Sequence, residues 1–150
     1  MVFDSVDALK NHILSCSRSA IIMVQEKIYQ VIDRFVKEYY AEFDPVMYER
    51  TYQLYRSLVK SDVTRTSNGW EAEVYFDIDA LDYHMKRVNG VEVPNKGWSE
   101  EKTLWAAAHG SHGGYNIGAT AIWYDPLKIL SAEGYNMLKK ALIDAGIPIR

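Results

Sequence analysis

The sequence predicts an α+β fold, in which a long N-terminal amphipathic helix and a C-terminal helix pack on a small, mostly antiparallel sheet. Apolar residues recur at three- and four-residue steps from Ala20 to Phe43, the pattern of one buried helical stripe. A strictly alternating segment from Trp70 to Ala80 is typical of a half-buried strand. With 150 residues, of which 48% are hydrophobic, the chain suits a single domain over residues 1–150 with one core.

The N-terminal third is expected to contain two helices. Residues 4–16 have apolar side chains at helical spacing, with Asp4 or Ser5 available as the N-cap. The run SCSRS, from Ser15 to Ser19, consists of weak helix formers and predicts a break. A second helix then covers residues 20–43, a length of roughly 36 Å at 1.5 Å per residue. Its predicted buried stripe is Ile21, Val24, Ile28, Val31, Ile32, Phe35, Tyr39 and Phe43, and its polar face holds Gln25, Glu26, Lys27, Arg34, Lys37 and Glu38.

The segment between the long helix and the strand, FDPVMYERTYQLYRSL, forms a corner of the fold. Asp44 and Pro45 supply an N-cap followed by proline at the first helical position, so a compact helix is expected from Pro45 to about Lys60. Asp62 to Thr66, with the turn Ser67-Asn68-Gly69, then forms a hairpin with the alternating strand.

The C-terminal half combines an exposed excursion with shorter elements. Residues 82–116 are expected to form a flexible excursion, because VNGVEVPNKGW is dense in Asn, Gly and Pro. Ser99 caps a short helix through Thr103 to Ala108, HGSHGG ends that regular structure, and a strand is expected over residues 117–123. Asp125-Pro126 opens a last helix with Leu127, Leu130, Leu138, Ala141 and Leu142 on one side, ended by Gly146 and Pro148.

Charge and composition disfavour several function classes. Lys and Arg number 17 against 20 Asp and Glu, and the net charge of −3 offers no general attraction for a phosphate backbone. A single cysteine, Cys16, forms no intrachain disulfide and has no paired histidine in the sequence, which predicts a structural thiol. The N-terminus does not resemble a signal peptide, and no segment reaches the ~18 apolar residues of a membrane span. We therefore expect synthesis in the cytoplasm and no membrane association.

Two groups of residues are candidates for enzymatic chemistry. His109 and His112 in HGSHGG could share a metal, and the outward face of the alternating strand carries carboxylates suited to acid–base work or cation binding. A metal site needs further ligands in a fixed frame, and the sequence contains no HExxH, CxxC, Walker or GxGxxG motif. We predict no catalytic residue, no metal and no cofactor. The alternative is a small metal-dependent hydrolase or nuclease that uses the two histidines and the carboxylates Glu71, Glu73, Asp77 and Asp79.

Assembled in order, these elements give a resemblance to a phage family. Arg50-Thr51-x-x-Leu54-x-x-Ser57-Leu58 resembles the Arg-Thr-Gly-x-Leu-x-x-Ser stretch of the tail-completion or head–tail joining proteins of long-tailed bacteriophages, which are minor capsid or minor tail components. The similarity spans most of the chain. Tyr52 stands where that family has Gly, which favours a continuing helix over a tight turn.

The resemblance implies a virion structural protein of the head–tail connector, acting by ring assembly between portal and tail tube. Its partners would be identical copies of itself, the portal or adaptor and tail-tube proteins, with DNA at most passing through the lumen. It would reside in the host cytoplasm during assembly and then at the head–tail junction of the virion. A bacterial adaptor or toxin–antitoxin partner is a further alternative. The expected assembly interface consists of Arg50, Tyr52, Tyr55, Tyr75, Trp98, Trp105, His109, His112 and Tyr115.

Overall fold

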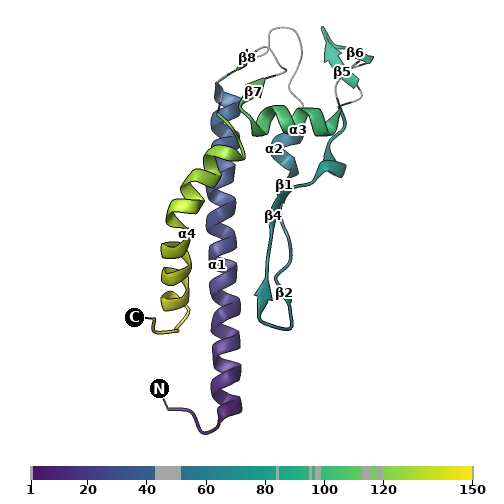
Figure 1. Cartoon of the computed structure of the whole chain (residues 1–150). Helices are drawn as coiled ribbons and strands as arrows, with labels where there is room; N and C mark the ends of the chain where they lie inside the picture. The colour runs from purple at the N-terminus through teal and green to yellow at the C-terminus, as the bar shows by residue number, and fades with distance from the viewer. Residues whose placement is uncertain are drawn as a thin grey trace. The chain divides into compact units, whose positions relative to one another are not determined.

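The computed structural model describes residues 2–42, 52–83, 85–94, 96, 99–112, 116–117 and 120–149, and only the backbone of residues 87, 112, 116 and 117. It confirms the predicted α+β class (Figure 1). The helices are α1 (Val6–Ala41), α2 (Gln53–Ser57), the 3₁₀ helix η1 (Ile78–Ala80), α3 (Glu100–Ala108) and α4 (Tyr124–Asp144). The strands are β1 (Leu58–Lys60), β2 (Thr64–Arg65), β3 (Trp70–Glu71), β4 (Val74–Phe76), β5 (Met85–Val88), β6 (Val91–Pro94), β7 (Ser111–His112) and β8 (Asn116–Ile117).

The strands of the described residues pair as four separate two-stranded ladders, where the sequence predicted one small sheet. β1 pairs with β4, β2 with β3, β5 with β6, and β7 with β8. The last three ladders are antiparallel. Each is short, so the fold depends on its helices for most of its burial.

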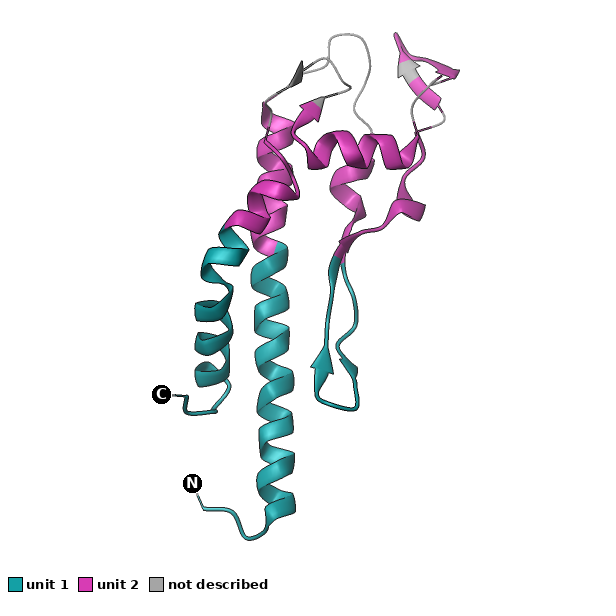
Figure 2. Cartoon of the chain, in the orientation of Figure 1, with its two compact units in different colours: residues 1–29, 60–74, 129–150 teal, residues 30–59, 75–128 magenta. Residues whose placement is uncertain are grey.

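The chain divides into two compact units (Figure 2). Unit 1 comprises Met1–Tyr29, Lys60–Val74 and Ile129–Arg150, and unit 2 comprises Gln30–Val59 and Tyr75–Lys128. α1, α4 and the β1–β4 ladder contribute residues to both units. The single domain over residues 1–150 stays a prediction.

α1 is one continuous helix of 36 residues, and the predicted break at the serine run is wrong. The hydroxyl of Ser17 donates to the carbonyl of Ile13 at 2.7 Å, and the hydroxyl of Ser19 donates to that of Ser15 at 3.2 Å. Serines that bond back to the preceding turn lose no hydrogen bond in a helix, so their weak propensity does not interrupt it. At 1.5 Å per residue the helix is about 54 Å long.

In unit 1, the predicted hairpin of β2 and β3 is confirmed. Thr64 lies opposite Glu71 and Arg65 opposite Trp70, and the amide of Thr66 donates to the carbonyl of Gly69 at 3.0 Å to close the turn. The predicted strand from Trp70 to Ala80 is shorter than expected. Its inside–outside alternation holds as far as Phe76, after which η1 begins with the Asp77 carboxylate accepting from the amide of Asp79.

Gln25 of α1 occupies an unexpected place in the core of unit 1. It was expected on the polar face, yet it is only 8% exposed. Its Nε2 donates to the carbonyls of Ser61 and Glu73, both at 2.9 Å. These two carbonyls lie on opposite sides of the hairpin, next to the β1–β4 ladder. The amide of Ser61 also donates to the carbonyl of Glu73. The Gln25 amide therefore attaches both sides of the hairpin to the helix.

In unit 2, the helix expected from Pro45 to Lys60 is confirmed for Gln53–Ser57 and is wrong for Tyr52 and Leu58–Lys60. α2 begins only at Gln53, and Leu58–Lys60 forms strand β1. Tyr52 has φ 56° and ψ 21°, the left-handed conformation, so it cannot continue a helix. The continuing helix that was predicted from Tyr52 is therefore wrong. Tyr52 instead adopts the backbone conformation that glycine takes most easily. Residues 43–51 lie outside the described part.

The excursion contains more regular structure than predicted. β5 and β6 form a hairpin in which Met85 lies opposite Pro94 and Val88 opposite Val91. Asn89 and Gly90 make its turn with φ values of 50° and 79°, as a two-residue type I′ turn requires. The Asn-Gly pair was the signal for this hairpin.

α3 is confirmed, with Ser99 as its N-cap. The Ser99 hydroxyl accepts from the amide of Lys102 at 3.3 Å, the usual N-cap hydrogen bond. The helix ends at His109, after which β7 pairs with β8, although no regular structure was expected in HGSHGG.

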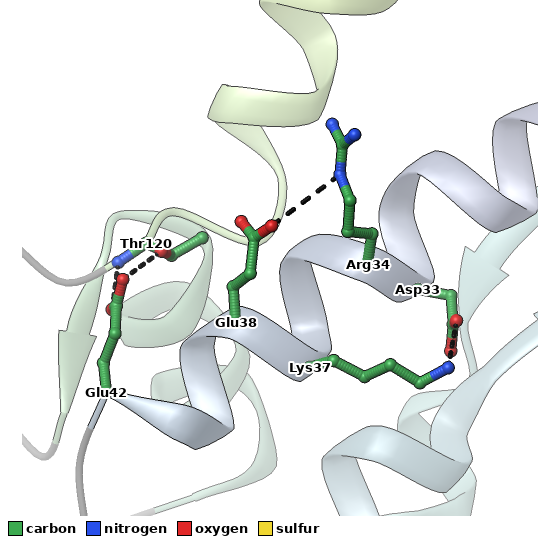
Figure 3. Close-up of polar contacts among 6 residues, drawn as sticks. All are labelled: Asp33, Arg34, Lys37, Glu38, Glu42 and Thr120. Carbon is green, nitrogen blue, oxygen red and sulfur yellow. Dashed lines mark hydrogen bonds and ion pairs between the residues drawn. The ribbon is translucent and has the colours of Figure 1, made fainter.

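The end of α1 in unit 2 is held by polar contacts (Figure 3). Along the helix, Arg34 pairs with Glu38 at 3.8 Å, and Lys37 pairs with Asp33 at 2.7 Å. At its end, the Glu42 carboxylate accepts from both the amide and the hydroxyl of Thr120.

α4 begins at Tyr124, so the strand predicted over residues 117–123 is wrong for residues 120–123. Residues 118 and 119 lie outside the described part. The Asp125 carboxylate accepts from the amide of Ala121 at 3.0 Å and pairs with Lys128 at 2.8 Å, which stabilises the first turn. The pKa of Asp125 is lowered by the hydrogen bond from Lys128 and by the backbone amide.

The C-terminal stop of α4 is as predicted, but its buried face is shifted. Gly146 has φ 99° and follows the last turn, where the amide of Ile147 donates to the carbonyl of Leu142 at 2.8 Å. Leu127 and Leu138 are exposed, which contradicts the predicted stripe. Ala141 is buried as predicted, and Pro126 and the preceding Ile122 are buried in addition.

Candidate assembly surface

A shallow apolar hollow lies in unit 2, with a volume of about 360 Å³. Three parts of the chain form it: β4 with η1, helix α3, and the residues just before α4. Almost all of the lining atoms are apolar. The residues around it are Tyr75, Phe76, Ile78, Glu101, Leu104, Trp105, Ala108 and Trp123.

The spacing of residues in α3 explains how it contributes one wall. Glu101, Leu104, Trp105 and Ala108 are three or four residues apart and therefore share one face of the helix. Ala106 and Ala107 are buried. The small side chains of this helix thus face the core, while its largest side chain lies outward.

Aromatic rings build the rest of the hollow and its border. Phe76 and Trp123 meet edge to face with ring centroids 6.3 Å apart. Trp105 is 64% exposed, an unusual exposure for the largest aromatic side chain. His109 lies between Trp105 and Tyr124, with ring centroids 4.3 Å and 4.8 Å away. Together these rings form an exposed apolar cluster.

The geometry of His109 gives it a structural role. Its Nδ1 lies 2.8 Å from the carbonyl oxygen of Trp105 and, because a carbonyl only accepts, Nδ1 is the protonated nitrogen that donates. For His112 the structure gives only the backbone, in β7. Within the described part of the chain, no three His, Cys, Asp or Glu side chains lie close enough to hold a metal ion.

The predicted interface residues fall into different groups. Tyr75 and Trp105 line the hollow and His109 lies beside it. Tyr52 and Tyr55 form a second aromatic cluster around Tyr40, with ring centroids at 5.2 Å and 6.4 Å. The predicted residues Arg50, Trp98 and Tyr115 lie outside the described residues.

Sequence reasoning missed the aliphatic part of the hollow and one other exposed aromatic residue. Ile78 was assigned to one face of the predicted strand and Leu104 to a short helix. They meet in the hollow because the strand ends at Phe76 and because Leu104 lies on the lining face of α3. Tyr135 of α4 is 73% exposed. In the sequence, the four-residue spacing of Glu101 and Trp105 indicated that these two side chains share the face of the helix that lines the hollow.

The strand carboxylates do not form the predicted single face. Glu71 lies in β3 of unit 1, whereas Asp77 and Asp79 belong to unit 2, where Asp77 caps η1 through the amide of Asp79 at 3.1 Å. Asp77 therefore has a local backbone role. The enzymatic alternative loses the continuous strand on which it depended.

Cys16 does have a histidine neighbour, in contrast to the prediction. The Nε2 of His12 lies 3.5 Å from its Sγ, one helical turn earlier in α1. Cys16 is 8% exposed and lies close to Gly146. A Cβ atom added to Gly146 would be 3.7 Å from the sulfur of Cys16. The i, i+4 spacing of His12 and Cys16 was visible in the sequence.

Among the helices that the structure describes, none is both long enough and apolar enough to cross a membrane. A comparison with protein families finds one matching model, YomN, over residues 5–128. That family is named after a gene product of a Bacillus prophage region. Comparisons with curated proteins and with solved structures give no match.

Proposed function

The chain belongs to the YomN family, a phage-associated family, and from this premise we propose that it is a structural protein of the phage head–tail connector. It acts in tail completion or head closure, by ring assembly between portal and tail tube. Its partners are further copies of itself, the portal or adaptor, and the tail-tube proteins. It is present in the host cytoplasm during assembly and then in the virion.

The observation that supports assembly is the exposed aromatic hollow of unit 2. A contiguous apolar surface on a soluble chain costs free energy unless a partner covers it. Trp105 is 64% exposed at the border of this hollow, and Tyr75 and Ile78 are also exposed there. Aromatic residues are enriched at the centres of protein interfaces, where they contribute most of the binding energy. The hollow therefore suits a protein contact.

The proposal also holds that the chain is not an enzyme. His109 has its Nδ1 directed to a backbone carbonyl and its ring packed between two aromatic rings. Such a histidine orients the end of α3. The alternative hydrolase or nuclease requires His109 and His112 to bind a metal, and a purified chain with stoichiometric zinc or manganese by elemental analysis would favour it.

Deletion of the gene from a phage that carries it tests the connector function. We expect lysates of the deletion phage to contain DNA-filled heads and separate tails in electron micrographs, with plaques restored by the wild-type gene in trans. Trp105→Ala should fail to restore plaques. Tyr135→Ala is the matched control, because Tyr135 is 73% exposed but belongs to unit 1 and does not line the hollow, and it should restore them. Joined, infectious particles from the deletion phage would exclude the connector role.

A further inference from the structure

We propose that a second surface of this chain binds the hollow of another copy: Arg18, Trp70 and Arg65 in unit 1, called here the arginine–tryptophan face. The inference rests on the proposed assembly function and specifies the contact between neighbouring subunits. It assigns the arginines to the carboxylates beside the hollow of the next copy. The carboxylates concerned are Asp77, Asp79 and Glu101.

The arginine–tryptophan face is held rigidly at its centre. The indole Nε1 of Trp70 donates to the carbonyl of Leu14 in α1 at 2.8 Å. The guanidinium carbons of Arg18 and Arg65 lie 5.7 Å and 5.0 Å from the centroid of the same Trp70 ring. Cation–π packing of this kind is favourable and holds the arginine side chain in place. Less conformational entropy is then lost when the arginine binds a partner.

Both arginines are available to an acidic partner. Each side chain is exposed, and within the part of the chain that the structure describes neither forms an ion pair. Arg65 comes from β2 directly opposite Trp70, while Arg18 comes from α1. Two guanidinium groups from two separate elements therefore pack on one ring and leave their charge exposed.

The hollow offers the opposite charge. Glu101 lines it directly, and Asp77 and Asp79 flank the lining residue Ile78 in the chain. Glu101 accepts a hydrogen bond from the Ser99 hydroxyl at 2.8 Å, and none of these three carboxylates forms an ion pair with a described residue. A carboxylate within an aromatic wall suits arginines that already pack on a tryptophan.

The occupant we assign is a second copy, because the two surfaces are complementary in charge and are made of different residues. Contacts between different surfaces of identical subunits are heterologous, and they generate rings or open filaments. A nucleic acid is the less suitable partner for the arginines. The hairpin that presents Arg65 also carries Glu71 and Glu73, which repel a phosphate backbone, and the whole chain has a net charge of −3.

Two charge-reversed variants test the contact. The face variant is Arg18→Glu with Arg65→Glu, and the hollow variant is Asp79→Arg with Glu101→Arg. By sedimentation velocity, each variant alone should self-associate about 100-fold or more weakly than the wild type, because like charges then oppose each other. Mixed together, the two should assemble again with alternating subunits, because the reversed face matches the reversed hollow and the unchanged face of the hollow variant matches the unchanged hollow of the face variant. One chain carrying all four substitutions should assemble again.

A matched control has the same change in net charge as the face variant. Lys10→Glu with Lys27→Glu alters two exposed lysines of α1 and should assemble like the wild type. Circular dichroism of every variant shows whether it is folded, and Arg18→Gln with Arg65→Gln provides a milder loss of charge if the face variant unfolds.

Three results would overturn the proposal. They are a wild-type chain that does not self-associate, undiminished association of the face variant, and a mixture that associates no better than its components. If the face variant instead loses affinity for DNA while keeping its assembly, the arginines bind nucleic acid. None of these outcomes affects the deletion phenotype, so the connector function and the subunit contact can fail separately.

Discussion

Gln25 allows a quantitative test of how the hairpin is attached in unit 1. Its amide donates to the carbonyls of Ser61 and Glu73, both at 2.9 Å, from a side chain that is 8% exposed. Two hydrogen bonds at about 0.5–1.5 kcal/mol each give about 1–3 kcal/mol. The Glu73 carbonyl keeps a second partner, the amide of Ser61 at 3.0 Å, which limits the penalty. We therefore expect Gln25→Met, which keeps the volume, to lower the free energy of unfolding by about 2 kcal/mol.

The measurement is urea unfolding followed by circular dichroism at pH 7. Gln25→Glu provides a second readout, because its carboxylate faces two carbonyls and its folded pKa is raised above the ordinary value for glutamate. Stability from the protonated form is present at low pH and is lost as the pH rises through that folded pKa. The Glu variant should therefore be less stable than the Met variant at pH 7 and should recover in acid. A loss below about 0.5 kcal/mol in the Met variant would refute the attachment.

Three further substitutions test local features. In urea unfolding, Tyr52→Gly should be more stable than Tyr52→Ala by about 0.5–1 kcal/mol. Both variants lose the ring stacked on Tyr40, but only the alanine variant keeps the strain of the left-handed backbone conformation. Equal stabilities of the two variants would contradict this. Gly146→Ala should cost about 1 kcal/mol from its φ of 99°, and an unchanged melting temperature would exclude strain there. Asp125→Asn should be destabilising at neutral pH. Lys128 lowers the pKa of Asp125 in the folded chain. The wild type is therefore more stable than the variant above the ordinary pKa of aspartate, and this extra stability is lost as the pH falls through the lowered pKa. A difference in stability that does not change with pH would count against this ion pair.

Local signals in the sequence sufficed where one residue controls the backbone. Ser99 as an N-cap, Gly146 as a C-terminal stop and the Ser-Asn-Gly turn before Trp70 each act within a few residues, and each was predicted correctly. The α+β class followed from the two periodicities. These features depend on short-range hydrogen bonds and φ preferences, which a sequence states directly.

Prediction failed where a side-chain contact reverses the preference of a residue type. The serines near Cys16 are weak helix formers, yet they bond within the helix and stay in it. Gln25 reads as a surface residue until the carbonyls of the hairpin are placed beside it. Tyr52 adopts the left-handed conformation although tyrosine disfavours it, and its ring stacks on Tyr40. The partners of Gln25 and Tyr52 lie outside the window that periodicity covers, whereas those of the serines lie one helical turn away.

The candidate surface shows the same division between composition and placement. The sequence placed Tyr75, Trp105 and His109 in the expected interface, but a list of residues does not tell a single exposed ring from a cluster. Tyr135 is more exposed than Trp105, and single exposed apolar residues are common on ordinary surfaces. Trp105 differs because it borders a hollow built with Ile78 and Leu104, beside His109. A folded chain gains nothing by keeping this cluster in water, so the cluster is better explained by a partner that covers it than by the requirements of folding.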